Sequence, residues 1–154
     1  MSNVLAMQTQ DGTGSLVYAT PLIPPGVYLL AFRNHETVWQ FRSPKLVLWF
    51  SVATPGPALG AVLCRYYAVR SVATKSRAKG GQFQFGQKSD FYREFCRVFG
   101  APARIDRISP ASYRNTVVLG EVATVTMGHD QQPIPEGAKY SKVARLISLE
   151  AGRG

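Results

Sequence analysis

Residues 45–52 alternate between apolar side chains at every second position and a mixed set between them, a pattern that predicts a half-buried β-strand. The positions that share the apolar face are Leu46, Leu48, Phe50 and Val52. The positions that share the other face are Val47, Trp49 and Ser51. Strand-like segments recur along the chain and a clear helical period occurs once, so the chain is predicted to be mainly β.

Four further segments have strand-like composition, at residues 26–41, 61–72, 116–127 and 141–149. The first is interrupted by polar residues 33–36, which predicts one long bent strand or a strand with a bulge. Pro55 and Pro57 predict a loop before the third strand, so the first three strands are expected to form a meander. The last segment fits a short strand or a helix, and we favour a strand.

The helical pattern covers the residues between Ser89, a predicted N-cap, and Gly100, a predicted stop. Its apolar stripe consists of Phe91, Phe95, Val98 and Phe99. The side chains expected on the opposite, polar face are Arg93, Glu94 and Arg97. The predicted element order is therefore β-β-β-α-β-β.

The length of 154 residues suits a single domain. Residues 1–20 are rich in Ser, Thr, Gln, Asn and Gly, and order is expected to begin near the Pro24-Pro25-Gly26 turn. We therefore predict flexible tails at 1–24 and 151–154 around one domain at 25–150. The start of the chain lacks a basic region followed by an apolar one, and no apolar run is long enough to span a bilayer, so we expect a cytoplasmic protein that does not bind membranes.

The chain carries 18 Lys and Arg against 9 Asp and Glu, a formal net charge of +9. Eleven of the basic residues fall between Arg65 and Arg114, with only three acidic residues in the same stretch. Such clustering favours a polyanionic partner, with a generally solubilising surface as the alternative.

Catalytic chemistry has little support in the sequence. Cys64 and Cys96 have no C-x-x-C spacing and are expected to be buried free thiols. Paired carboxylates would have to come from distant positions, such as Glu36, Asp106 and Asp130. His35 and His129 are expected to be solvated at strand ends or in loops. We predict no enzyme activity, no cofactor and no metal.

Residues 75–88 interleave basic side chains with glycines and with the rings of Phe83 and Phe85. Such an arm can close over a nucleic-acid strand, and the alternative is a hairpin whose phenylalanines pack into the barrel. Gly81, Gly86 and Lys88 approximate a phosphate-binding P-loop, but one extra residue and the lack of a preceding parallel strand exclude it.

The predicted order, with its helix between the third and fourth strands, resembles the OB-fold, a five-stranded Greek-key barrel that binds oligonucleotides. Over residues 25–150 the chain is also similar to small replication-associated proteins of phages and mobile elements. The segments that carry this similarity are Ser43-Pro44-Lys45-Leu46, Asp106-Arg107-Ile108-Ser109-Pro110 and Tyr140-Ser141. The resemblance implies single-stranded DNA binding in replication or recombination, and small OB proteins often form homo-oligomers.

An OB-type site needs exposed rings for base stacking and cations for phosphates. The stacking candidates are Trp49, Tyr67, Phe83 and Phe85. Tyr66 could replace Tyr67, since one of the two is expected in the core. The phosphate-contact candidates are Lys45, Arg65, Arg70, Lys75, Arg77, Lys79 and Lys88. The rival interpretations are a β-barrel interaction or assembly module that meets an acidic protein, and binding of RNA instead of DNA.

Overall fold

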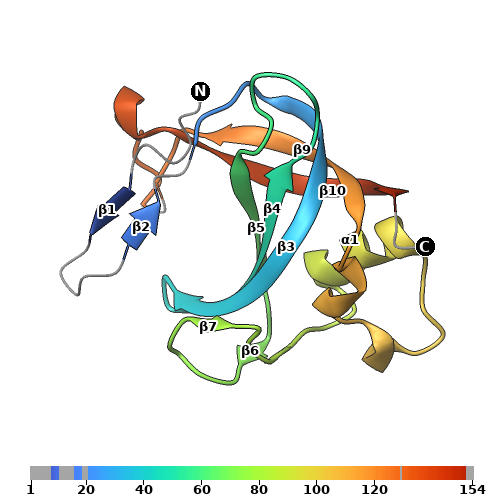
Figure 1. Ribbon diagram of the computed structural model, residues 1–154. Coiled ribbons are helices and arrows are strands. Elements are labelled where there is room, and N and C mark those ends of the chain that lie inside the picture. Colours follow the sequence, from blue (N-terminus) through green and yellow to red (C-terminus); the bar gives the residue numbers. More distant parts are fainter. Residues whose placement is uncertain (1–7, 11–15, 19–20, 129, 152–154) are drawn as a thin grey trace.

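Figure 1 shows a computed structural model, which describes residues 8–10, 16–18, 21–128 and 130–151. Its strands are β1 (Gln8–Gln10), β2 (Leu16–Tyr18), β3 (Gly26–Gln40), β4 (Ser43–Val52), β5 (Val62–Ala68), β6 (Ser71–Val72), β7 (Ala78–Lys79), β8 (Phe83–Gln84), β9 (Val117–Val125) and β10 (Tyr140–Ala151). Its helices are α1 (Asp90–Phe99) and the 3-10 helices η1 (Ile105–Arg107), η2 (Pro110–Tyr113) and η3 (Glu136–Ala138). The prediction of a mainly β chain with one α-helix is confirmed.

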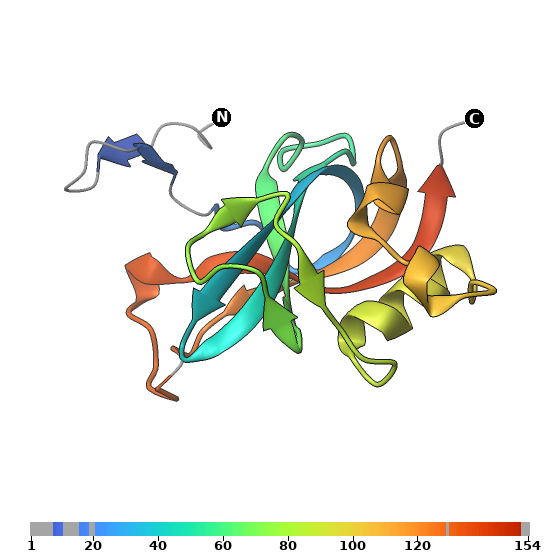
Figure 2. The same cartoon turned by 90° about the horizontal axis from the view of Figure 1, so that it is seen from below.

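The main sheet is antiparallel, in the order β10-β9-β3-β4-β5, and β7 pairs with β3 as well. The sheet curls strongly, so that β10 comes to lie against β5 (Figures 1 and 2). Among the described residues no backbone ladder joins these two strands, so the sheet is not a closed barrel, in contrast to the prediction.

The long first strand contains the predicted bulge. The register of β3 against β4 shifts between Phe32 and Asn34, which leaves Arg33 as the extra residue. The opposite edge of β3 pairs with β9 from Gly26 to Ala31 and with β7 only at Glu36 and Thr37. The bulge therefore coincides with a gap between two partner strands.

The third strand is shorter than predicted. It ends at Ala68, because Arg70 N–H donates to Gln84 O at 2.8 Å and turns the chain toward the β6–β8 pair. The last segment is a strand, as favoured, and covers Tyr140–Ala151. Ile23, inside the predicted N-terminal tail, is buried, and its N–H donates to Ser141 Oγ at 2.8 Å. The folded domain thus includes residues before Pro24.

Helix α1 packs its apolar stripe onto the inner face of the sheet. Ser89 Oγ accepts from Tyr92 N–H as the predicted N-cap, and Gly100 ends the helix with φ of +87°. The buried core between helix and sheet includes Leu46, Leu48, Phe50, Val52, Tyr67, Phe91, Phe95, Val98, Tyr113, Val118 and Leu146. In the part of the chain that the structure describes, no helix is long and apolar enough to cross a bilayer.

Glu94 is buried in the seam between β5 and β10, although the helical pattern placed it on the polar face. Its carboxylate accepts from Arg65 Nη2 at 2.6 Å, from the Tyr67 hydroxyl at 2.7 Å and from Leu146 N–H at 3.0 Å. Burial lowers the pKa of Arg65, but the hydrogen bond and charge of Glu94 leave that pKa above its usual value. Because Arg97 also donates to Leu146 O at 3.1 Å, α1 side chains take the place of a strand ladder at this seam.

Candidate nucleic-acid interface

Strand register defines the face of the sheet that points away from the core. Lys79, Glu36, Val47 and Tyr66 are successive partners across β7, β3, β4 and β5, and Asn34, Trp49 and Cys64 form a parallel row. Partners across an antiparallel ladder project to the same side. We call this side the outer face, made of Asn34, Glu36, Val38, Lys45, Val47, Trp49, Cys64, Tyr66, Arg77 and Lys79.

A small apolar cluster fixes the two rings of the outer face. Val38, Val47 and Cys64 are buried there, and Trp49 and Tyr66 pack against them, half-buried. Burial raises the pKa of the Cys64 thiol to about 12, although the charge of Arg77 acts in the opposite direction. Cys64 is therefore a neutral packing residue at physiological pH. Trp49 and Tyr66 each keep part of their ring surface exposed.

The polar groups of the outer face centre on Glu36. Its carboxylate accepts from Trp49 Nε1 at 3.0 Å and forms an ion pair with Arg77. Burial lowers the pKa of Arg77, but the charge of Glu36 leaves it above its usual value. Lys45 is half-buried and Lys79 is exposed, and neither forms an ion pair with a described residue. The outer face thus combines two anchored rings with three cations and one carboxylate.

The loop before β7 lies along the end of β3. Lys75 Nζ sits 4.7 Å from the ring centroid of Trp39, which is 41% exposed. Trp39 was not predicted as a contact residue, because it lies at the end of β3, where alternation no longer separates core from solvent. This loop therefore brings Lys75 and Arg77 toward the sheet.

Four predicted contact residues meet on the outer face: Lys45, Trp49, Arg77 and Lys79. Four others, Arg65, Tyr67, Phe83 and Phe85, pack toward the core instead. Tyr67 is 1% exposed, and Arg65 lies over its ring while bound to Glu94. Tyr66 is the outer ring because it pairs with Val47, whereas Tyr67 pairs with the core residue Leu46.

Phe83 and Phe85 also pack inward, as in the alternative weighed for their loop. Their ring centroids lie 5.6 and 5.1 Å from that of Phe91, in edge-to-face geometry. Both rings are half-buried, and neither lies on the outer face. Phe83 lies in β8, which pairs with β6, and Phe85 follows just after this strand.

The remaining predicted cations, Arg70, Lys75 and Lys88, are exposed but not part of the outer face. The guanidinium of Arg70 lies beside Gly86: a Cβ added at Gly86 would lie 2.8 Å from Arg70 Nη2. Lys88 precedes helix α1, and its carbonyl accepts from Arg93 Nη1 at 2.6 Å. The structure does not bring these three together with Trp49.

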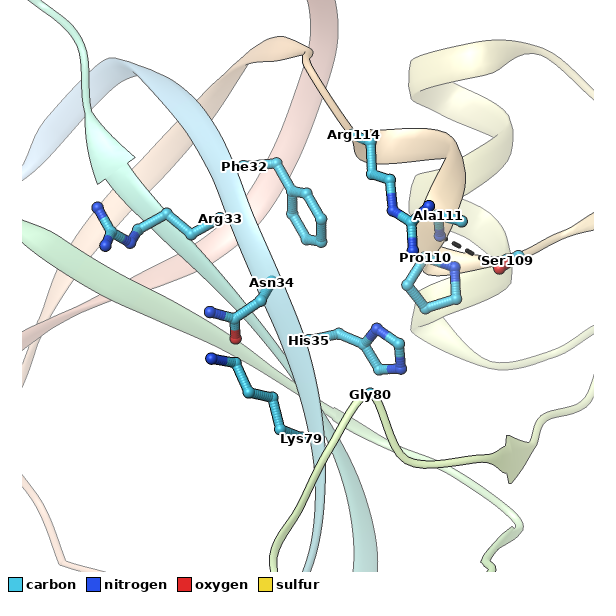
Figure 3. Close-up of a pocket in the computed structure, with 10 residues that line it drawn as sticks. All are labelled: Phe32, Arg33, Asn34, His35, Lys79, Gly80, Ser109, Pro110, Ala111 and Arg114. Atoms are coloured by element: carbon cyan, nitrogen blue, oxygen red, sulfur yellow. Dashed lines mark hydrogen bonds between the residues drawn. The ribbon is translucent and has the colours of Figure 1, made fainter.

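A cleft of about 380 Å³ opens beside the β3 bulge (Figure 3). One wall is formed by residues 32–35, a second by Lys79 and Gly80, and a third by residues 109–111 together with Arg114. Asn34 and Lys79 belong to both the cleft and the outer face, and Figure 3 shows the Lys79 amine next to the Asn34 side chain. The cleft is therefore continuous with the outer face.

The lining of the cleft carries Arg33, Lys79 and Arg114, and no Asp or Glu among the described residues. His35 also lines it, and its Nε2 donates to Gly81 O at 3.1 Å. From the sequence, Arg114 was predicted only as part of the basic cluster, and Arg33 was not predicted as a contact residue. No local signal links two arginines so far apart in the chain, because the cleft forms only when η2 packs beside β3.

The acidic candidates for metal or catalytic chemistry lie apart. Glu36 binds Arg77, Asp106 binds Arg104 at 2.6 Å, and Asp130 accepts from Gln132 N–H. Within the described ranges no three His, Cys, Asp or Glu side chains gather into a metal-binding group. Both cysteines are free, Cys64 buried and Cys96 half-buried, and His129 lies outside the described residues.

Comparisons with protein-family models, with curated proteins and with solved structures find no match to this chain, so its function has to be argued from the geometry above.

Proposed function

We propose that this protein binds single-stranded DNA across its outer face, without catalysing a reaction. The observation that carries the proposal is the combination of two part-exposed rings, Trp49 and Tyr66, with three cations on one strand-built surface. Rings of this kind stack on unpaired bases, and each stack contributes about 1–3 kcal/mol. The resemblance noted in the sequence adds a role in replication or recombination of a phage or mobile element.

The strand connections support an OB-type interpretation of the fold. β3 pairs with both β4 and β9, β4 with β5, and β9 with β10, while α1 lies between β5 and β9 in the chain. In the OB-fold, the second and third strands and the loops beside them bind oligonucleotides. The corresponding strands here are β4 and β5, which carry Trp49 and Tyr66.

The geometry favours a single strand over a duplex. Trp49 and Tyr66 pack against the Val38–Val47–Cys64 cluster and are half-buried, so they can offer ring surface only to bases that are already unstacked. Lys45, Arg77 and Lys79 lie beside the rings, where they can contact the phosphates between successive bases.

An acidic protein partner is the second candidate function, and one observation favours it. Arg77 already binds a carboxylate, that of Glu36, on the outer face. In such a complex Trp49 and Tyr66 would become interface anchors instead of stacking platforms.

The test is a fluorescence-anisotropy titration of labelled oligo-dT, duplex DNA and RNA of equal length at two salt concentrations. We expect salt-sensitive preference for oligo-dT. The double variant Lys45→Ala/Lys79→Ala should lower the slope of log affinity against log salt by about 1.4, since each single-strand phosphate contact contributes about 0.7. Lys88→Ala/Arg107→Ala, which removes two exposed cations outside the outer face, is the matched control.

Equal and weak binding to all three nucleic acids would overturn the proposal and favour the acidic-partner function. Preference for RNA would keep the interface and change the ligand. An equal loss in both double variants would mean that the net charge, and not the outer face, accounts for binding.

A further inference from the structure

We infer that the cleft beside the β3 bulge binds one nucleotide, with its phosphate at Arg114 and its base against Phe32. The inference deepens the proposed function, on which it rests for the claim that this nucleotide belongs to the bound strand. It adds a defined one-nucleotide pocket to a surface that otherwise tolerates any sequence.

The cleft is held open by the fold. On one side Phe32 N–H donates to Thr116 O at 3.3 Å, at the end of the β9 pairing. On the other side Gly80 N–H donates to His35 O at 2.8 Å, at the start of the β7 pairing. The two bonds fix both ends of the gap, so the space between them is part of the folded sheet.

The charged side chains of the cleft favour an anionic ligand. Arg33, Lys79 and Arg114 form no ion pair with any described residue, whereas Arg65, Arg77 and Arg145 each bind a carboxylate. Figure 3 shows the Arg114 guanidinium on the same side of β3 as Phe32 and Pro110, and the Arg33 and Lys79 side chains on the opposite side. Arg114 is therefore the cation that an anion beside Phe32 meets, and its planar donors match a phosphate.

The cleft is larger than a lone phosphate requires and has an apolar part. Its volume of about 380 Å³ lies in the range of small-ligand pockets. The Phe32 ring is fixed by Phe50 and Tyr113, whose ring centroids each lie 5.8 Å from its own, and Pro110 stands opposite (Figure 3). A fixed ring facing a proline suits a flat base, and the side chains of Asn34 and Ser109 supply hydrogen-bonding groups.

The position of the cleft suits a nucleotide that leaves the outer face. Asn34 pairs with Trp49 and Lys79 pairs with Glu36, so both lining residues also border the stacking surface. A DNA strand that stacks on Trp49 therefore reaches the border of the cleft at Asn34, which lies directly opposite Trp49 on the neighbouring β-strand.

The experiment is a calorimetric titration of the full chain with dTMP, thymidine and inorganic phosphate. We expect dTMP to bind measurably more tightly than either thymidine or phosphate, because it alone uses both the Arg114 guanidinium and the Phe32 ring. Arg114→Gln should weaken dTMP binding about tenfold through loss of charge-assisted bonds. Arg107→Gln, an exposed arginine outside the cleft, should leave it unchanged, and far-UV circular dichroism verifies that each variant folds.

Two results would overturn the inference: no dTMP binding to the parent protein, or equal binding to the parent and to Arg114→Gln. Phosphate binding as tight as dTMP binding would reduce the cleft to an anion site and contradict the role of Phe32. The double variant Lys45→Ala/Trp49→Leu separates the two proposals, because it should lose oligo-dT binding and keep dTMP binding. If the parent binds dTMP but not oligo-dT, the proposed function fails and the nucleotide pocket stands.

Discussion

The inner and outer faces of the same sheet use aromatic residues in opposite ways. Inside, Tyr67 meets Phe91 edge to face and Tyr113 meets Phe95 edge to face, and these rings are almost completely buried. Outside, Trp49 and Tyr66 are diagonal neighbours on adjacent strands, part-exposed and next to cations. Aromatic content alone therefore says little about stacking, because a shift of one position along a strand decides which role a ring takes.

The two faces also differ in how they hold an acid. Glu94 inside accepts from three donors and joins α1, β5 and β10. Glu36 outside is shared between Trp49 and the half-exposed Arg77. If the inner face is built for stability and the outer face for binding, substitutions should separate the two properties.

The largest effect is expected for Glu94→Ala. It leaves the buried Arg65 guanidinium without its carboxylate partner, and breaking such a pair costs about 3–5 kcal/mol of unfolding free energy. Urea denaturation measures the loss. Glu136→Ala is the control, because Glu136 is 86% exposed in its ion pair with Lys139 and should matter little. A loss below about 1 kcal/mol for Glu94→Ala would contradict the role of the seam.

The two buried tyrosines provide a finer test of the inner face. Tyr67→Phe removes a donor to the charged Glu94 and should cost about 1.5–3 kcal/mol. Tyr113→Phe should cost nothing or stabilise slightly, because the buried Tyr113 hydroxyl has no hydrogen-bond partner among the described residues. Thermal unfolding of both variants measures the difference, and equal losses would show that the Tyr67–Glu94 hydrogen bond adds no stability.

On the outer face, Trp49→Leu should weaken oligo-dT binding by about tenfold, through loss of one base stack. Phe83→Leu is the matched inner change, since Phe83 packs on Phe91. It should lower stability and leave the dissociation constant of the folded protein unchanged. Anisotropy titration at a temperature where both variants are folded compares them. Weaker oligo-dT binding by Phe83→Leu and unchanged binding by Trp49→Leu would show that Phe83, and not Trp49, contacts the bases.

The smallest effect is expected for Glu36→Gln. The amide oxygen can still accept from Trp49 Nε1, but Arg77 loses its carboxylate and becomes free for a phosphate. We expect oligo-dT to bind up to about fivefold more tightly, within the range of a surface ion pair. Weaker binding would mean that Glu36 positions Trp49 more than it competes with phosphates.

The sequence was sufficient where a local period determines the outcome. Strand β4 keeps strict alternation, and Ser89 and Gly100 bound the helix with local capping chemistry, so these elements were predicted with little error. The sequence was insufficient where a residue distant in the chain determines whether a side chain is buried. Glu94 shares the polar side of the helical pattern but meets Arg65, which lies 29 positions earlier.

The candidate site shows the same division. Trp49 was assigned to the outer face because alternation placed it opposite the core positions of β4. The cleft could not be predicted, because Arg33 and Arg114 line one space only through the packing of η2 beside the bulge. Phe83 and Phe85 were ambiguous because the short β8 is defined by its pairing with β6 and not by its own sequence.

The most direct test of the outer-face claim uses the intrinsic fluorescence of Trp49. The chain has two tryptophans, so Trp39→Phe leaves Trp49 as the single reporter. Titration with unlabelled oligo-dT should quench its emission along the same saturation curve as the anisotropy of a labelled oligonucleotide, because a base stacks on the indole. Saturable anisotropy without any change in Trp49 emission would contradict the account and place the nucleic acid elsewhere on the molecule.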